Sequence, residues 1–580
     1  MVPCRELIPV LCRKGYLDMA LNVLMRLNVA PSIESYLCLL KLCTQKKALF
    51  QIKQVQAHIS HSKIQISGRL GDYLVVSLAR CGAPDDALST LLSLPFRTVF
   101  SWTATISGYT DNGDGSEALR LYKCMLEDGI QCDEYTYVSL FKACGNTIDL
   151  EHGMCLHIEA AKKGFTSDVY VRSTLISMYG KCDALAEAEN IFFGMLEHTV
   201  VSWNAMLSAY VEQRHGDSAL QLFVQMQITG VNPSYLTFVI ALQACLTLLD
   251  RWRDSFDGDT FCKAVVLDVG QALHSDAARR NLLSNKFVCS MLVTLYGRCG
   301  EVSKAEHAYC FLPEYSLVSC TSLLSAYVDH GHTEKALLFY VEMEKWGVVW
   351  DHVMITCVLQ ACSLSGNLEI CKHLHFIIVS AGYDDVLPLV ATLIHCYGNC
   401  AYMVDGQVCF DGLPESNLVL WNACISAHAA EGNLFACLDM FENLSLVGLL
   451  PDGVTFNSAL CACSHSGHFL RGLEYFSLMI DHYYLTPDMK HYGSILDLLA
   501  RAGNFKLVKH VLQSMTFPAD LSVWLCLLGA CRVHGNLQLA RQAFHEAIAL
   551  QPKQDTAYVV MSGFYEDRTL WEGISASYEE

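Results

Sequence analysis

The sequence predicts an all-α protein in which pairs of helices stack side by side into a superhelical solenoid. Three series of motifs carry this prediction, because each returns along the chain at the same long interval, and a fixed period is the signature of a repeat array. With only 13 Pro in 580 residues, and no strand-like alternation recurring at the repeat period, the repeated unit is expected to be helical.

The most informative series is Val-Ser-Trp-Asn at 201–204, which recurs in altered form three times. Its polar fourth residue is Thr103, Asn204, Thr321 and Asn422, which gives steps of 101, 117 and 101 residues. Two cysteine series repeat these steps, one through Cys43, Cys144, Cys245, Cys362 and Cys463, the other through Cys81, Cys182, Cys299 and Cys400. The agreement of the three series places one insertion of 16 residues between Cys245 and Cys299.

One unit, residues 200–234, shows the internal plan of the repeat. Its first helix is expected to bury Trp203, Met206, Leu207 and Tyr210, and its second helix Ala219, Leu222, Phe223 and Met226. The polar stretch 212–217 separates the two helices, Gly230 ends the second, and Pro233 prevents its continuation. Two helices of this length cannot bury their apolar faces alone, so each pair is expected to stack on the next and to form a concave face.

Composition sets limits on function. Apolar residues make up 52% of the chain and charged residues 17%, which suits helices that bury one face against a neighbour. The net charge of −19 argues against a loose, charge-driven binder of nucleic acid, although a basic groove within an acidic exterior stays open. No run of 18 or more apolar residues occurs, so no membrane span is expected.

The 28 cysteines invite a disulfide or metal interpretation. Most of them fall at recurring positions of the repeat, and no Cys-x-x-Cys pair exists. Small buried thiols in a reducing compartment are therefore favoured.

Three interleaved motifs resemble the plant pentatricopeptide repeat (PPR) proteins, specifically the PLS subfamily, in which long, short and standard repeats alternate. The motifs are Val-Ser-Trp-Asn-Ala-Met-Leu-Ser-Ala-Tyr at 201–210, Phe-Lys-Ala-Cys at 141–144 and Ser-Met-Tyr-Gly-Lys-Cys at 177–182. The resemblance runs from about residue 11 to the C-terminus. It implies a right-handed superhelical α-solenoid of helix-turn-helix PPR repeats.

In this register the chain is expected to hold a partial N-terminal repeat at 1–32, a PLS-type PPR array at 33–520, a first E motif at 521–554 and a truncated second E motif at 555–580, without a DYW deaminase domain. The units of the array are expected to begin at residues 33, 68, 99, 134, 169, 200, 235, 286, 317, 352, 387, 418, 453 and 489. The insertion is expected within about 246–266, where the stretch 251–259 has no counterpart elsewhere. A surface loop is the favoured interpretation, with a functional element or a gene-model error as alternatives.

The resemblance implies that each repeat reads one nucleotide of single-stranded RNA with a polar residue of its first helix and another at the repeat boundary. Carried over unit by unit, the base-reading pairs are Thr103 with Asp133, Asn204 with Ser234, Thr321 with Asp351, Asn422 with Asp452, Asn457 with Asp488, Ser173 with Thr199, and Ser290 with Ser316. Two pairs depart from the family's code, namely Asp72 with Thr98 and Ala391 with Asn417. The long units place Leu37, Val138 and Val239 at the reading position and are expected to select little.

The family's code applied to these pairs implies the target G-n-R-C-n-R-G-n-n-U-U-n, read 5′ to 3′ from the unit at residue 99. In editing members of the family, the edited cytidine lies four nucleotides beyond the last contact. Three residues before the readers stand Phe100, Val201, Val318 and Val419. The family uses this position to stack between bases, and a residue that packs the start of the helix is the equally weighted alternative.

Catalysis by this chain alone is not expected, and neither a catalytic residue nor a cofactor is predicted. His332-Thr333-Glu334 matches the first half of the zinc deaminase signature, but the Pro-Cys-x-x-Cys half does not occur. His395, Cys396 and Cys400 place two thiols at metal-ligand spacing, yet Cys400 belongs to the repeating series, which favours packing.

The resemblance implies a sequence-specific RNA-binding protein of a mitochondrion or chloroplast that selects sites for C-to-U editing. A DYW-type deaminase and other editing factors would be supplied in trans, and the oligomeric state is left open. No clear transit peptide precedes the first repeat. The alternatives are an organellar RNA stability or splicing factor and a protein-binding scaffold of the tetratricopeptide kind, against which the paired polar residues count.

Overall fold

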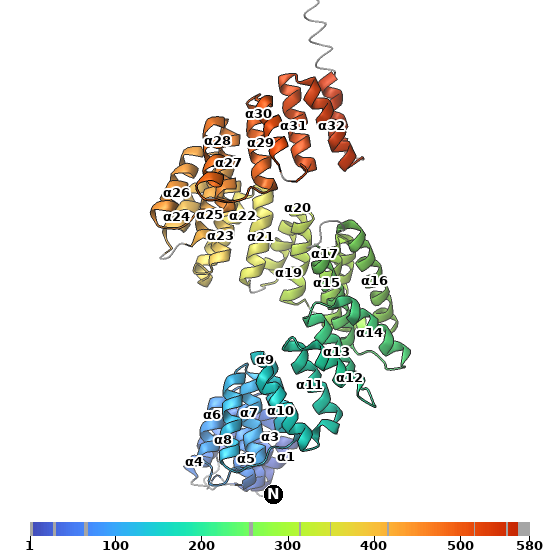
Figure 1. Cartoon of the computed structure of the whole chain (residues 1–580). Helices are drawn as coiled ribbons and strands as arrows, with labels where there is room; N and C mark the ends of the chain where they lie inside the picture. Colours follow the sequence, from blue (N-terminus) through green and yellow to red (C-terminus); the bar gives the residue numbers. More distant parts are fainter. Residues whose placement is uncertain are drawn as a thin grey trace, which may run out of the picture. The chain divides into compact units, whose positions relative to one another are not determined.

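The structure is a computed structural model, and it describes residues 4–26, 31–62, 66, 68–253, 259–312, 315–347, 350–413, 417–515, 517–552 and 555–565. Within these ranges the regular structure is helical and no strand occurs (Figure 1), so the predicted all-α class is confirmed. None of the described helices is long and apolar enough to cross a membrane.

The chain divides into two compact units, Met1–Tyr315 and Ser316–Glu580. In the first unit, the first helix of each pair is α1 (Cys4–Arg13), α3 (Ile33–Gln45), α5 (Gly68–Arg80), α7 (Val99–Asp111), α9 (Glu134–Thr147), α11 (Val169–Lys181), α13 (Val200–Glu212), α15 (Tyr235–Arg253) and α17 (Lys286–Cys299). The second helices are α2 (Leu17–Arg26), α4 (Leu49–His61), α6 (Pro84–Ser93), α8 (Gly115–Glu127), α10 (Leu150–Lys162), α12 (Leu185–Phe193), α14 (Gly216–Ile228), α16 (Asp259–Arg279) and α18 (Val302–Cys310).

The second unit continues the same alternation. Its first helices are α19 (Leu317–Asp329), α21 (His352–Ser365), α23 (Leu387–Asn399), α25 (Leu418–Glu431), α27 (Gly453–Ser466), α29 (Met489–Arg501) and α31 (Leu521–His534). Its second helices are α20 (Thr333–Lys345), α22 (Leu368–Ala381), α24 (Met403–Asp411), α26 (Leu434–Leu446), α28 (Phe469–Asp481), α30 (Phe505–Ser514) and α32 (Leu537–Leu550), and residues 555–565 are also helical.

Within each unit the first helices pack against one another in chain order, and each also packs against its own second helix (Figure 1). The helix-turn-helix solenoid expected from the repeats is therefore confirmed. Each unit start named above, from residue 33 to residue 489, coincides with the first residue of a helix, as does residue 521. The partial pair at 1–32 contains α1 and α2.

The motif residues that set the period lie in the core between helices. Trp102, Trp203 and Trp421 are buried. In the repeat that has no tryptophan at this position, Cys320 takes its place and is also buried. The cysteine series that begins at Cys43 is also fully buried, and burial raises the pKa of Cys144 and of Cys245 to about 12. These thiols stay protonated at neutral pH and act as small apolar side chains.

The insertion is not the expected surface loop, and that expectation is wrong for its described residues. Residues 246–253 extend α15 to 19 residues and residues 259–266 belong to the 21-residue α16, whereas α13 and α14 have 13 residues each. Leu246, Leu249 and Val266 are buried, which shows that apolar residues at helical spacing continue the packed faces. Residues 254–258 of the insertion lie outside the described residues.

A recurrent His–Tyr hydrogen bond joins the second helix of a long unit to the first helix of the following short unit. His157 Nδ1 lies 2.9 Å from the hydroxyl of Tyr179, and the matching pairs His274–Tyr296 and His375–Tyr397 are separated by 2.8 Å. Burial lowers the pKa of all three imidazoles, so they are neutral at physiological pH.

Neighbouring first helices approach most closely where glycine faces alanine. A Cβ placed on Gly180 of α11 would lie 2.4 Å from the Cβ of Ala209 on α13, and one on Gly398 of α23 would lie 2.5 Å from Ala427 on α25. Glycine is therefore required at these two positions by the distance between the helices, in contrast to Gly529 of α31, where nothing lies within 4 Å.

Gly180→Ala should lower the free energy of unfolding by roughly 1–3 kcal/mol, because the added methyl group forces α11 and α13 apart. Gly529→Ala is the matched control, since the same change in open space should stabilise its helix by up to about 1 kcal/mol. Denaturant unfolding of the full chain measures both values. Two shifts of the same sign would contradict this account of the packing.

Candidate functional site

The predicted readers lie on one face of the first helices. Thr103, Asn204, Thr321 and Asn422 are each the fifth residue of their helix. In the first unit, α5, α7, α9 and α11 line a groove of about 490 Å³, and Phe100, Thr103 and Asp133 are among the residues of its wall. Side chains of α8 and α10 take no part in this wall. The groove thus belongs to the face formed by the first helices.

The boundary residues prove to be helix N-caps, which sequence reasoning did not foresee. The seven predicted boundary residues each stand immediately before a first helix, and their side chains accept hydrogen bonds from backbone N–H groups of its first turn: Asp133, Thr199, Ser234, Ser316, Asp351, Asp452 and Asp488. Ser, Thr, Asp and Asn are the residues that cap helices best. The polar character of this position therefore has a structural cause as well as the predicted reading role.

Two standard-length pairs are joined directly. Asn204 Nδ2 donates to Ser234 Oγ at 3.4 Å. Asn422 Nδ2 donates to Asp452 Oδ1 at 3.0 Å. Both asparagines are 8% exposed and are therefore largely buried. The structure thus brings together the members of these two pairs, 30 residues apart in sequence.

The pair Thr103 and Asp133 is joined through a third residue. Thr103 Oγ1 lies 2.7 Å from Thr136 Oγ1, and Thr136 Oγ1 donates to Asp133 Oδ1 at 2.7 Å. Thr321 and Asp351 bind different partners. Thr321 Oγ1 donates to the carbonyl of Leu317 at 2.9 Å, and Asp351 caps α21.

The remaining pairs differ from the standard ones. Ser173 donates to the carbonyl of Val169 at 2.7 Å and is 3% exposed, while Thr199 caps α13. Ser290 is 9% exposed, and Ser316 caps α19 of the second unit. Asp72 and Thr98, which depart from the code, are joined by a hydrogen bond of 2.7 Å from Thr98 Oγ1 to Asp72 Oδ1.

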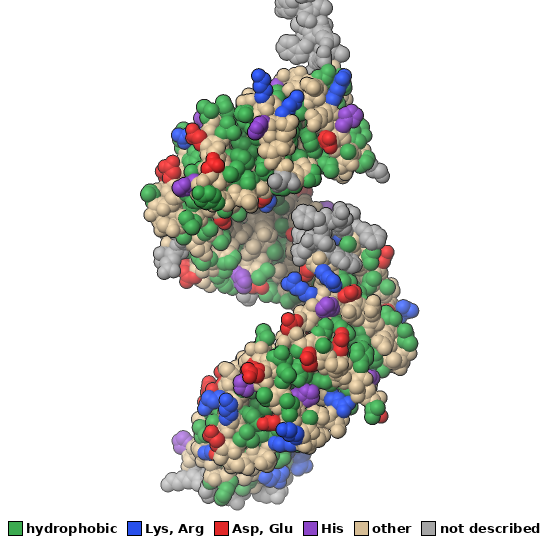
Figure 2. Space-filling model, viewed as in Figure 1, with side chains coloured by type: hydrophobic (Ala, Val, Ile, Leu, Met, Phe, Trp, Pro, Cys, Tyr) green, Lys and Arg blue, Asp and Glu red, His purple; other side chains and the backbone are tan. Residues whose placement is uncertain are grey.

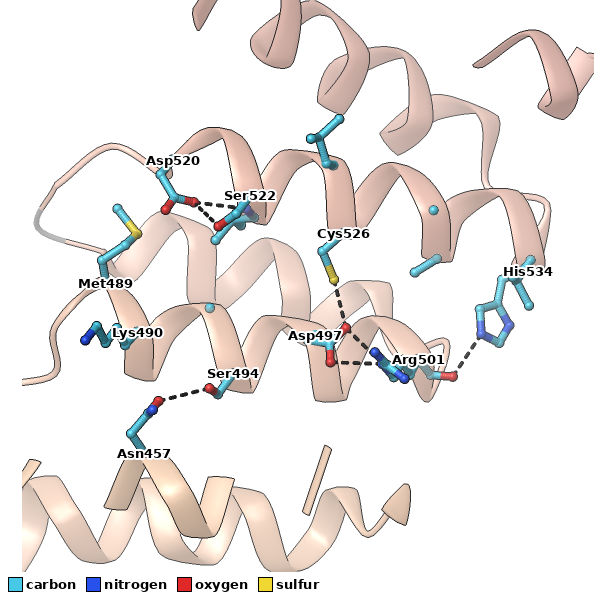
Figure 3. Close-up of a pocket in the computed structure, with 16 residues that line it drawn as sticks. Asn457, Met489, Lys490, Ser494, Asp497, Arg501, Asp520, Ser522, Cys526 and His534 are labelled. Carbon is cyan, nitrogen blue, oxygen red and sulfur yellow. Dashed lines mark hydrogen bonds and ion pairs between the residues drawn. The ribbon is translucent and has the colours of Figure 1, made fainter. Parts of the chain in front are cut away.

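Asn457 and Asp488 are held by different partners. Asn457 Oδ1 accepts from Ser494 Oγ at 3.1 Å, and Asp488 Oδ1 lies 2.5 Å from His491 Nδ1. Figure 3 shows Asn457 and Ser494 at one end of a hollow of about 850 Å³ between α27, α29 and α31. At the reading position of α29 stands Gly493, which leaves this hollow open.

At the other end of the hollow, Asp497 of α29 accepts hydrogen bonds from the side chains of Arg501 and Cys526, at 2.9 and 2.8 Å (Figure 3). The ring of His534 lies 3.0 Å from the carbonyl oxygen of Arg501. Asp497 and Arg501 are thus paired with each other within the chain.

The four predicted stacking residues project from the helices. Phe100, Val201, Val318 and Val419 are 67%, 54%, 66% and 59% exposed. A residue that packs the start of a helix would be buried, so this exposure favours contact with a ligand over the packing alternative.

Sequence reasoning missed most of this exposed row. The second residue of further first helices is also apolar and exposed, with Tyr135, Tyr170, Leu236 and Phe287 in the first unit and Val353 and Val454 in the second. The position can be found in the sequence, because it follows each capping residue by two. The sequence prediction named it only in the standard-length units.

The described residues hold no group of three or more His, Cys, Asp or Glu side chains placed to bind a metal ion. Cys396 is fully buried. His332 precedes α20 as its cap residue, and Glu334 lies in the first turn of that helix. On the face that Figure 2 shows, basic and acidic side chains are interspersed over each unit.

Comparison with known proteins places the chain in a family. The PPR repeat family model matches residues 97–146 and 198–247, and the PPR repeat model matches 170–200, 318–348, 419–448 and 454–483. An Arabidopsis thaliana protein, the pentatricopeptide repeat-containing protein At4g14850, is 30% identical over 513 residues, which cover 88% of this chain and 73% of the relative. The chain belongs to the pentatricopeptide repeat family.

Two further Arabidopsis thaliana PPR proteins are each 28% identical, At1g11290, chloroplastic, over 96% of this chain and At3g02330, mitochondrial, over 95%. The chain spans 67% and 61% of the lengths of these two relatives. Among solved structures, the PPR protein PPR10 in complex with an 18-nt psaJ RNA element has a TM-score of 0.51 at 18% identity, covering 99% of this chain and 84% of that one. This likeness supports the solenoid fold.

The capping role of the boundary residues leads to a test of stability. Asp452→Ala should lower the free energy of unfolding by about 1 kcal/mol, because the N–H of Thr455 loses its acceptor at the start of α27. Asp452→Ser keeps a capping oxygen and should cost much less. Thermal unfolding of both variants measures the difference, and equal losses would show that capping is not what this side chain contributes.

Proposed function

We propose that this PPR protein binds single-stranded RNA and reads its sequence with the paired residues of its first helices. The single observation that carries the proposal is the direct pairing of Asn204 with Ser234 and of Asn422 with Asp452, whose asparagines stand at the same place of the first helices α13 and α25. Each pair combines hydrogen-bond donors and acceptors, which is what recognition of a base edge needs. A surface that holds peptides has no need for such a pair at the same place in successive repeats.

The exposed apolar row provides the second part of the binding surface. One apolar side chain per repeat, from Phe100 to Val454, stands beside the reading position. Base stacking on the aromatic members of this row, such as Phe100, Tyr135 and Phe287, contributes about 1–3 kcal/mol per base and tolerates any sequence. Affinity from stacking can therefore make up for the weak electrostatic attraction expected of a chain with a net charge of −19.

We propose the target G-n-R-C-n-R-G-n-n-U-U-n, with contributions from Thr103/Asp133, Ser173/Thr199, Asn204/Ser234, Ser290/Ser316, Thr321/Asp351, Asn422/Asp452 and Asn457/Asp488. The hydrogen bonds within the standard-length pairs support the positions G, C and U that follow from Thr103, Asn204 and Asn422. The last U has less support, because Asn457 and Asp488 bind different partners.

We further propose an organellar site-recognition factor for C-to-U editing, with a DYW-type deaminase supplied in trans. The names of the chloroplastic and mitochondrial relatives support an organelle. The helices α31, α32 and 555–565 follow the array where the PLS interpretation expects E motifs. Crosslinking followed by sequencing of bound organellar RNA tests this role: an edited cytidine four nucleotides beyond the bound pattern is expected. Bound sites without such a cytidine would favour an RNA stability or splicing factor.

Exchanging one pair should change one base of the preferred RNA. In the double variant Asn204→Thr, Ser234→Asp, the preference at the nucleotide opposite the unit 200–234 should move from C to G by about tenfold, because the new pair matches Thr103 with Asp133. Both changes keep a capping residue before α15, so stability is preserved. Equilibrium binding to two RNAs that differ at this nucleotide measures the switch. Unchanged relative affinity would reject the register.

Removing one stacking side chain should weaken binding without altering sequence preference. Phe100→Ala is expected to reduce affinity about fivefold to a hundredfold, which corresponds to the stacking contribution of one base. Phe193→Ala is the matched control, since Phe193 is 58% exposed but belongs to the second helix α12. The same RNA titration serves both variants. Equal losses at the two positions would place the binding surface elsewhere.

A further inference from the structure

A buried threonine stands beside three of the four standard-length pairs. Thr136, Thr237 and Thr455 are each the third residue of the helix that follows the pair, and all three are 0% exposed. Thr237 Oγ1 donates to Asn204 Oδ1 at 2.7 Å, and Thr455 Oγ1 lies 2.6 Å from Asn422 Oδ1. These hydroxyls therefore join the first helix of one repeat to the reader of the repeat before it.

At the first pair, this contact fixes the direction of a hydrogen-bond chain. A carboxylate can only accept, so the single hydroxyl hydrogen of Thr136 goes to Asp133 Oδ1, 2.7 Å away. The contact between Thr136 and Thr103, also 2.7 Å, must then be donated by Thr103. With its own hydrogen directed inward, Thr103 offers only lone pairs to a ligand, and it accepts.

At the asparagine pairs, the buried threonine does not by itself determine what the reader offers. Asn204 lies between two hydroxyls, Thr237 Oγ1 at 2.7 Å and Ser234 Oγ at 3.4 Å, and a hydroxyl can donate or accept, so either orientation of the amide satisfies both contacts. Thr455 Oγ1 lies 2.6 Å from Asn422 Oδ1 and 2.9 Å from Asp452 Oδ1, and its single hydrogen can serve only one of these acceptors. Asn422 is oriented by the carboxylate of Asp452, which can only accept and therefore faces Nδ2.

We infer that Thr136 is a positioning residue that determines base specificity at the first pair, by making Thr103 an acceptor. The inference rests on the proposed function. An accepting Thr103 suits guanine, whose Watson–Crick edge carries N1–H, and rejects adenine, whose N1 is an acceptor.

The fourth pair is a natural contrast within the same chain. Met354 of α21 occupies the place of the threonine and is buried, and Thr321 is oriented by its own helix through the carbonyl of Leu317. The direction of this reader is thus independent of the residue at position 354. A change at Met354 should leave the base preference opposite Thr321 unaltered.

The test measures base preference in the purified full-length chain by equilibrium binding to twelve-nucleotide RNAs that carry the proposed pattern. Thr136→Val removes the bridging hydroxyl at nearly constant volume and should reduce the preference for G over A opposite Thr103 about tenfold. Thr136→Ser restores a hydroxyl and should restore the preference, and Met354→Val should leave the preference opposite Thr321 as it is.

The outcomes separate this inference from the proposed function. If the unmodified chain shows no preference at these nucleotides, the proposed reading register is wrong. If it shows the preference for G and Thr136→Val keeps it, Thr136 does not determine specificity. A loss of affinity that is equal for all RNAs, together with a lowered Tm, would show a merely structural role and would also overturn the inference.

Discussion

The hydrogen bond that caps the first helix in most of the described repeats is the interaction on which the architecture depends. A side-chain oxygen at these boundaries fixes where the helix begins, and through it which residue becomes the fifth of that helix and stands at the reading position. The cap contributes about 1 kcal/mol to a helix that could not persist alone. The same side chain also lies beside the reader of the preceding repeat. Formation of the cap therefore also positions the two residues of the pair next to each other.

This dual role constrains how specificity can vary. The boundary position must remain Ser, Thr, Asp or Asn for the cap, and those are residues that can also bind a base edge. The α23 repeat shows a departure, since Val386 precedes this helix without a side-chain cap and Pro388 occupies its first turn. The reading position of the preceding repeat therefore has no polar partner at this boundary. Helix α23 forms without the cap because it packs against α21 and α25.

Much of the fold follows from the sequence because three series of motifs share one period. The spacing of Cys43, Cys144 and Cys245 sets the repeat, and the polar residue before each apolar run sets the helix start. The insertion was misjudged because its charged centre suggested a loop, whereas Leu246, Leu249 and Val266 continue the buried faces of α15 and α16.

The site was less accessible to sequence reasoning. Pairs such as Thr103 and Asp133 could be proposed from resemblance, but the bond between Thr103 and Thr136 joins residues 33 apart and depends on the distance between two helices. A threonine at that place is indistinguishable in sequence from an ordinary member of a capping box. The direction of its hydrogen bond, which decides what the reader offers to a ligand, appears only in the assembled helices.

Selection from a pool of randomised single-stranded RNA by the purified chain, followed by sequencing, tests the central claim most directly. The paired readers predict enrichment of G, C, G and U at every third nucleotide, in that order, corresponding to Thr103, Asn204, Thr321 and Asn422, with weaker preferences between them. Enrichment without this spacing, or no enrichment over the starting pool, would contradict the account that these pairs read bases.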